Sequence, residues 1–234
     1  MYYSKRNEGA RAATPEPGES RVEISVGAFN VLDSLITTID RKDHYTRRHS
    51  EDVARFAVAL GDELGLAYQE SRSLRVAGLL HDVGKIGIPD QLLLKPGPLT
   101  KEEYEVIKQH SGVGELIIDE IPNLRGMRDD IAAHHERYDG QGYPRGLVGE
   151  EIPLRARILA VADAYAAMTS DRPYHRALSL EGAETELRRV SGTQLDPLVV
   201  NALLAILRRA DGYERGPAKA PDKGSQTMHA TEIH

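Results

Sequence analysis

The sequence predicts a single all-α domain, and three observations carry this prediction. Apolar residues recur three and four positions apart in successive segments, which is the spacing of a buried helix face. No segment alternates apolar and polar residues over more than a few positions, and no internal repeat is found. Both ends of the chain are rich in Pro, Gly and polar residues and lack any such period. We therefore expect a disordered segment at 1–20, one helical domain at 21–211 and a disordered tail at 212–234.

Eight segments are predicted to form the helices of this domain. In the first, Leu32, Leu35 and Ile36 share one face. The fourth begins with Thr100 and Glu103, which have the spacing of a capping box. In order, the predicted helices are 26–40, 51–66, 71–82, 100–118, 128–137, 154–171, 179–190 and 196–210. The loop at 139–153 has room for a short extended segment but not for a sheet.

Composition narrows the classes of function. A chain of 234 residues can bury one good core, or at most two small ones. Because cysteine is absent, any metal must be held by nitrogen and oxygen atoms. The net charge of −6, from 30 basic and 36 acidic residues, argues against general nucleic-acid binding. No apolar run has the length of a membrane span or the layout of a signal peptide, so we expect a cytoplasmic protein that does not bind membranes.

Histidines and aspartates recur at the ends of apolar runs. A lone histidine on a helix is most often a surface residue or a hydrogen-bonded core residue. Here, however, a His-Asp pair follows the apolar run "VAGLL", a His-His pair follows "DDIAA", and an aspartate interrupts the apolar helix "ILAVADAYAAM". A buried carboxylate is costly unless it is paired or binds a metal. The candidate ligands are His49, His81, Asp82, His110, His134, His135 and Asp163. Mixed imidazole and carboxylate ligation favours iron, manganese, nickel or zinc over magnesium or calcium.

Two motifs give these residues a family context. The segments "HDVGKIGIPD" and "HHERYDGQGYP" resemble the HD-GYP family of metal-dependent phosphodiesterases, a branch of the HD superfamily. The similarity runs from about Val31 to about Leu203 and includes "LLKPGPLTKEEYEVIKQH" and "GTQLDPLVV". It implies a helical domain with a metal site between helices. It also implies hydrolysis of the 3′,5′ phosphodiester of cyclic di-GMP to pGpG or GMP, by a hydroxide bridging two iron or manganese ions; zinc, nickel or cobalt would also suit the ligands.

The resemblance also assigns roles to the candidate ligands. It implies that Asp82 bridges two ions, with one ion completed by His49, His81 and Asp163 and the other by His110, His134 and His135. Family members with a third metal have a glutamate four residues before the first ligand histidine. Because that position is Tyr45 here, we expect two metals.

Further residues are expected to meet the substrate. Lys85, in the turn after the His-Asp pair, would act with Asp82 in catalysis by placing a cation on a phosphate oxygen or leaving group; the alternative is an exposed lysine at a helix end. Arg172 is similar in position to a family arginine that holds the substrate, the alternative being an ion pair with Asp171. His175 stands where the family usually has lysine or arginine, which weakens a second substrate cation or makes it pH-dependent.

The glycine-rich loop leaves its own alternatives open. The glycines of "DGQGYP" should permit positive φ angles and a close approach of the chain. Tyr143 either stacks on a substrate base, faces a partner protein, or packs the loop onto the helices. Arg137 and Asp139 would tie the loop together.

Two other functions compete with cyclic di-GMP hydrolysis. One is an HD-type phosphohydrolase that acts on another nucleotide, such as cyclic GMP-AMP or a guanosine polyphosphate. The other is a non-catalytic module that binds a partner. For either the enzyme or the module, expected protein partners are diguanylate cyclases or a separate sensor.

Overall fold

A computed structural model describes residues 34–39, 42, 47–171 and 176–210 of the chain. Between Arg47 and Ala210, the described residues form the α-helices α2 (Arg47–Glu63), α3 (Tyr68–Leu80), α4 (Asp90–Leu93), α5 (Lys101–Asp119), α6 (Arg128–Ala132), α7 (Leu154–Thr169), α8 (Leu180–Val190) and α9 (Pro197–Ala210). Short 3₁₀ turns are η1 (Val83–Gly87), η2 (Arg125–Met127) and η3 (Gly149–Glu151). The described residues contain two isolated β-bridges and no strand, so the all-α prediction is confirmed. The predicted disordered ends, 1–20 and 212–234, lie outside the described residues.

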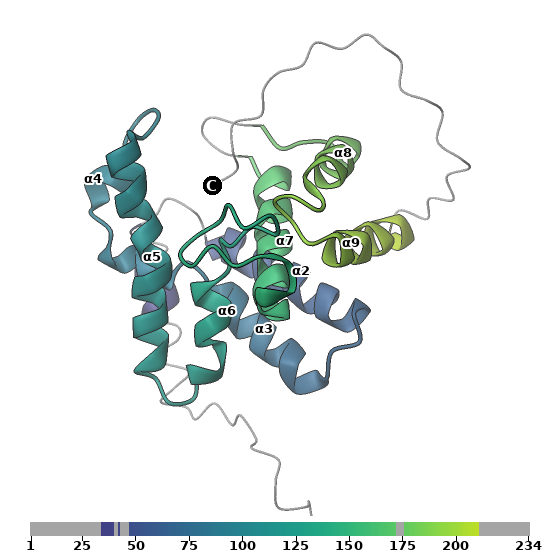
Figure 1. The fold of residues 1–234 in the computed structure, drawn as a ribbon, viewed down its shortest axis with the longest axis horizontal. Coiled ribbons are helices and arrows are strands. Elements are labelled where there is room, and N and C mark those ends of the chain that lie inside the picture. Colours follow the sequence, from purple (N-terminus) through teal and green to yellow (C-terminus); the bar gives the residue numbers. More distant parts are fainter. Residues whose placement is uncertain (1–33, 40–41, 43–46, 172–175, 211–234) are drawn as a thin grey trace, which may run out of the picture.

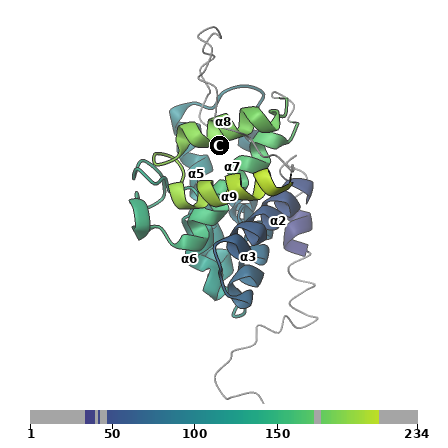
Figure 2. The same ribbon diagram turned by 90° about the vertical axis from the view of Figure 1, so that its right-hand side faces the viewer.

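Helix α7 is the centre of the domain. Figure 1 shows it between α5 on one side and α8 and α9 on the other, and Figure 2 shows α9 and α8 crossing in front of it. It packs against α2, α3, α6, α8 and α9. Ile158, Leu159 and Val161 are fully buried, because this helix is apolar on nearly every side. Any polar side chain on α7 that faces inward therefore needs a partner.

Two helices end immediately before the paired motifs. Helix α3 ends at Leu80, one residue before His81, and the chain continues as η1. Helix α6 ends at Ala132, five residues earlier than the predicted end at 137. Neighbouring side chains on a helix point about 100° apart, whereas a turn allows them to converge. The early end of α6 therefore decides how His134 and His135 are presented.

Close backbone packing brings η1 onto α5. A Cβ atom at Gly84 would overlap the carbonyl oxygen of His110 and the backbone nitrogen of Gly114. Only glycine fits at this approach. The predicted capping box also forms at the start of α5, where Thr100 Oγ1 accepts from Glu103 N at 3.2 Å and Glu103 Oε2 accepts from Thr100 N at 2.7 Å. Both features hold α5 where its His110 meets the turn after α3.

Candidate metal centre

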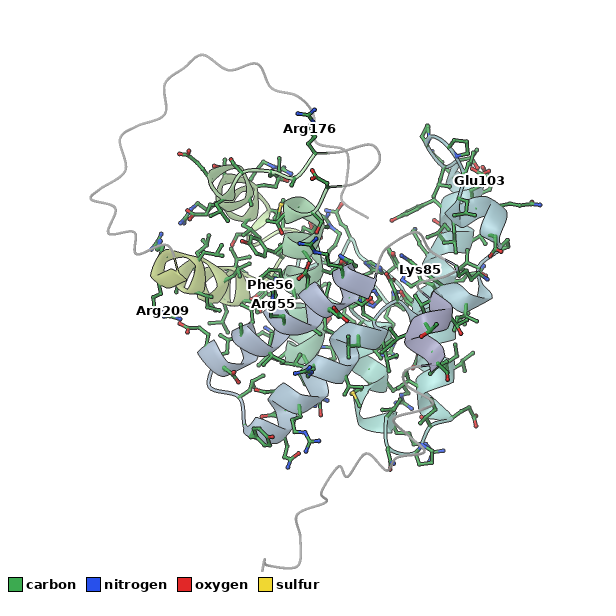
Figure 3. All side chains as sticks on the ribbon, turned by 180° about the vertical axis from the view of Figure 1, so that it is seen from behind. Arg55, Phe56, Lys85, Glu103, Arg176 and Arg209 are labelled. Carbon is green, nitrogen blue, oxygen red and sulfur yellow. The ribbon has the colours of Figure 1, made fainter. Side chains whose placement is uncertain are left out.

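All seven predicted ligands lie together in the interior of the domain. They form two groups, and in each group the candidate ligand atoms lie within 4.8 Å of one another. The first group is His49 from α2, His81 from the end of α3 and Asp163 from α7; the second is Asp82, His110 from α5, and His134 and His135 from the turn after α6. Lys85, beside Asp82, marks the location in Figure 3.

The first group joins α2 to α7. His49 Nε2 lies 3.0 Å from Asp163 Oδ1. Burial by itself would raise the pKa of Asp163, but the hydrogen bond and charge of His49 outweigh it and lower that pKa to about 2. Asp163 is therefore an ionised carboxylate within the apolar stretch of α7, as an oxygen ligand must be.

Asp82 lies between the two groups. Its Oδ2 is 3.2 Å from His81 Nε2, and its Oδ1 is 3.4 Å from His110 Nε2. Lys85 Nζ is 2.9 Å from Oδ2. Burial would raise the pKa of Asp82, but Lys85 and His81 together hold it well below its usual range. Each oxygen of one ionised carboxylate thus faces a different group, which is the arrangement that a bridging ligand needs.

Three histidines are oriented by the backbone of their own helices. The Nδ1 atoms of His81, His110 and His134 lie 2.8, 2.7 and 2.6 Å from the carbonyl oxygens three residues earlier. A neutral imidazole that donates from Nδ1 carries its lone pair on Nε2. In these same three residues Nε2 is buried and makes no well-aligned hydrogen bond among the described residues, although Nε2 of His81 and His110 faces the Asp82 carboxylate. Because a metal ion would supply that missing partner, the side chains present fit metal ligation.

The charge states of His134 and His135 agree with this fit, whereas His81 is protonated beside Asp82. Burial lowers the pKa of His134 to about 3 and holds that of His135 well below its usual value. Burial also tends to lower the pKa of His81, but the adjacent Asp82 outweighs it and raises the pKa to about 9. A proton on His81 Nε2 facing Asp82 occupies the place where a cation would bind.

His135 is held by the loop that follows it. Tyr143 N donates to His135 O at 3.2 Å, so the loop returns to its own starting point. The Tyr143 ring stacks on the His135 imidazole at 4.9 Å between centroids and 30° between planes. Tyr143 thus packs against a predicted ligand, and its contact with a substrate base or a partner protein stays a prediction.

Glu136 and two glycines fix the conformation of the rest of the loop. Buried Glu136 accepts from Arg145 N at 2.6 Å and from Leu147 N at 3.1 Å. Gly140 has φ +78°, and a Cβ at Gly142 would lie 2.6 Å from Glu136 Cα.

The expected pair of Arg137 and Asp139 forms with two contacts, at 3.1 and 2.7 Å. The Tyr143–Pro144 peptide is cis, and Asp139 and Val148 form an isolated bridge in place of a sheet.

A cavity of about 230 Å³ opens beside the centre. Its lining includes the predicted ligands His134, His135 and Asp163, together with Tyr104, Lys108 and Tyr143. Lys85 is not the exposed lysine of the alternative interpretation, because its side chain is 17% exposed and contacts Asp82. Arg172, His175 and Tyr45 lie outside the described residues. Lys108 was not among the predicted site residues; its spacing of four from Tyr104 and two from His110 was the only signal in the sequence.

Comparison with known proteins identifies the family. The HD domain family matches residues 33–199. This chain belongs to the HD domain family. The match includes every member of the two ligand groups, and the predicted relationship is confirmed.

Named relatives of this HD domain chain are phosphodiesterases. It is 41% identical over 204 residues to a cyclic di-GMP phosphodiesterase of Thermotoga maritima, covering 86% of this chain and 54% of the relative. It is 43% identical over 184 residues to the cyclic di-GMP phosphodiesterase response regulator RpfG of Xanthomonas campestris, covering 78% and 49%. A 3′3′-cGAMP-specific phosphodiesterase 1 of Vibrio cholerae is 37% identical over 171 residues, covering 73% and 40%. The chain thus spans about half the length of the curated relatives it matches.

Solved structures show the same fold. The structure of a cyclic GMP-AMP-specific phosphodiesterase from V. cholerae matches with a TM-score of 0.62 at 21% identity, covering 77% of this HD domain chain and 49% of that one. The HD domain of a phosphodiesterase of L. monocytogenes matches with a TM-score of 0.53 at 20% identity, covering 76% and 98%. In the part of the chain that the structure describes, no helix combines the length and apolar character needed to cross a membrane.

Proposed function

We propose that this chain is a metal-dependent phosphodiesterase that hydrolyses cyclic di-GMP to pGpG or GMP. The observation that carries the proposal is the pair of ligand groups joined by Asp82 at the wall of a cavity. The names of the relatives at 41% and 43% identity support this substrate. Because the chain covers only about half of those relatives, the substrate is proposed for the domain itself.

Two transition-metal ions, iron or manganese first, would occupy the centre. One ion would be held by His49, His81 and Asp163, and the other by His110, His134 and His135. Asp82 would contact both ions. When bound, such ions supply positive charge to a phosphate and lower the pKa of coordinated water. This donor set of nitrogen and oxygen atoms also suits zinc, nickel or cobalt.

The chain's own residues have two tasks in this proposal. Hydrogen bonds from Nδ1 keep Nε2 of His81, His110 and His134 directed at the centre. Lys85, held 2.9 Å from Asp82, brings a cation to the same place, where it can neutralise a phosphate oxygen or the leaving 3′-oxygen. Arg172, His175 and Tyr143 stay proposed as substrate-binding residues, of which Tyr143 lines the cavity. A cytoplasmic location and protein partners such as diguanylate cyclases or a separate sensor stay predictions.

A second substrate has an observation in its favour. Relatives at 37% and 33% identity are named 3′3′-cGAMP-specific phosphodiesterases. The two cyclic dinucleotides differ in one base, so the metal centre would serve both equally. The choice between them would depend on residues that read that base.

Turnover with a defined substrate panel tests the proposal. Protein loaded anaerobically with iron or manganese is incubated with cyclic di-GMP, 3′3′-cGAMP and a guanosine polyphosphate, and products are separated by chromatography. We expect two metal ions per chain and the fastest cleavage with cyclic di-GMP. Protein that holds two ions and cleaves none of these nucleotides would contradict the proposal and favour a partner-binding module.

A further inference from the structure

Lys108 has an unexplained position at the edge of the cavity. It lies on α5, two residues before His110. Its ammonium nitrogen is 4.8 Å from the ring centroid of Tyr104 and 5.5 Å from that of Tyr143. Its side chain is 27% exposed and lines the same cavity as His135. The two ring faces thus hold a cation at the cavity wall.

A local ion pair does not account for this position. Lys108 Nζ lies 2.6 Å from Glu105 Oε1, but the Glu105 side chain is 66% exposed and is not part of the cavity wall. Exposed pairs of this kind contribute little to stability, since water screens both charges. The contacts with Tyr104 and Tyr143 are the ones that direct the ammonium group toward the cavity.

The other charged groups of the wall are already engaged. Among the described residues that line the cavity, the only other lysine or arginine is Arg137, which makes its two contacts with Asp139. The carboxylate of Glu136 accepts from two backbone nitrogens of the loop. Lys108 therefore lines the cavity, while its carboxylate partner Glu105 does not. The charge of Lys108 is available to an anion bound in the cavity.

A cyclic dinucleotide brings two such anions in one ring. While the metal centre acts on one phosphodiester, the other carries a second negative charge that must be held within the same cavity. Lys108 and the ligand histidine His135 both contact the ring of Tyr143, at 5.5 and 4.9 Å from its centroid. A second charge in this cavity would thus meet Lys108 one aromatic ring away from a metal ligand.

We propose that Lys108 binds the phosphate that is not being cleaved and thereby selects cyclic dinucleotides over simple phosphodiesters. This inference rests on the proposed function and adds a specificity residue to it. The metal centre acts on any accessible diester, whereas Lys108 acts only on a substrate that has a second phosphate.

The test compares three substrates, two with a second phosphate and one without, across three variants. Lys108→Met removes the charge and keeps an unbranched stem, Lys108→Arg keeps the charge, and Lys101→Met is the control on the exposed start of α5. Metal-loaded proteins are assayed with cyclic di-GMP, 3′3′-cGAMP and bis(p-nitrophenyl) phosphate, which has one phosphate only. Loss of one charged contact should raise KM for the cyclic dinucleotides about 10-fold or more in Lys108→Met, with kcat changed less. Lys108→Arg should recover most of this loss, and bis(p-nitrophenyl) phosphate should be cleaved equally by all variants.

Each other outcome overturns the inference in a recognisable way. An equal loss on bis(p-nitrophenyl) phosphate would mean that Lys108 acts on the metal centre or on folding. No change with any substrate would mean that Lys108 is a surface lysine. Wild-type protein that cleaves bis(p-nitrophenyl) phosphate but no cyclic dinucleotide would overturn the proposed function, and this inference with it.

Discussion

The two ligand groups are built in different ways. His49 and Asp163 of the first group come from α2 and α7, and they meet only because those helices pack together. His134 and His135 of the second come from one turn, and the loop that follows returns to cover it. The first group therefore depends on long-range packing, whereas half of the second is specified by one continuous segment.

The pKa values of the side chains also differ between the two ligand groups. In the first group, Asp163 is stabilised as a carboxylate by His49, and His81 takes a raised pKa from Asp82. In the second, burial lowers the pKa of His110, His134 and His135, which leaves these imidazoles neutral. The second group thus has its nitrogen lone pairs ready at neutral pH, and the contrast between the groups can be tested by substitution.

The largest effect is expected from His134→Ala, which breaks the second group. Losing a ligand should remove an ion and reduce turnover more than about 100-fold, since even residues behind the ligands commonly matter 10- to 100-fold. Metal analysis and circular dichroism check this, and we expect the helical signal to stay unchanged. Gln109→Ala, at an exposed position on α5, is the control. Global unfolding of His134→Ala would mean that the centre mainly holds the fold together.

Gly142→Ala tests whether the loop can close on the second group. The added Cβ would meet backbone atoms of Glu136 and Arg137, which cannot move aside cheaply. We expect a loss of about 1–3 kcal/mol in the free energy of unfolding, measured by urea denaturation of metal-free protein. Gly112→Ala on α5 meets nothing within 4 Å and should be neutral or stabilising by up to about 1 kcal/mol. Equal stability of the two variants would contradict the close approach.

Two substitutions at Tyr143 distinguish the contribution of its ring to metal binding from that of its hydroxyl group. Tyr143→Ala removes the stack on His135 and should weaken metal affinity about 10-fold, as other residues that orient ligands do. Tyr143→Phe keeps the stack and loses only the hydroxyl hydrogen bond with Tyr104, so it should bind metal like the wild type. Competition with a chelator measures both. If Phe weakens binding as much as Ala, the hydroxyl and not the stack orients His135.

The smallest effect is expected from a substitution of Asp130, which should change how protein stability depends on pH. This residue is buried on α6, and its Oδ2 lies 2.9 Å from Arg155 Nε on α7. Burial outweighs the attraction of Arg155 and raises the pKa of Asp130 from 3.8 to about 6. The folded state therefore binds more protons than the unfolded state between these values. The stability that Asp130 contributes is complete below about pH 4 and is lost as the pH rises through about 6.

Asp130→Asn should remove this dependence. Denaturation of wild type and variant at pH 4 to 8 should show the variant gaining stability relative to the wild type as the pH rises. Parallel curves would show that Asp130 is ionised in the folded protein throughout.

The sequence by itself determined the longer helices, the capping box of α5 and the identities of the seven clustered residues, whereas the short helix α4 was not predicted. These properties are local or depend on residue type: a period of 3.6, a Ser/Thr-x-x-Glu pattern, and imidazoles and carboxylates in unusual apolar settings. They could be predicted because each is expressed within a short segment.

Only the tertiary structure decided how these residues meet. Nothing in the sequence shows that α6 ends at Ala132, that His49 faces Asp163 or that Tyr143 covers His135. The same holds for Lys108, which looks like any polar residue on an amphipathic helix until the loop places Tyr143 beside it. Periodicity tells which side of a helix is buried, but the partner on that side is chosen by packing between segments distant in sequence.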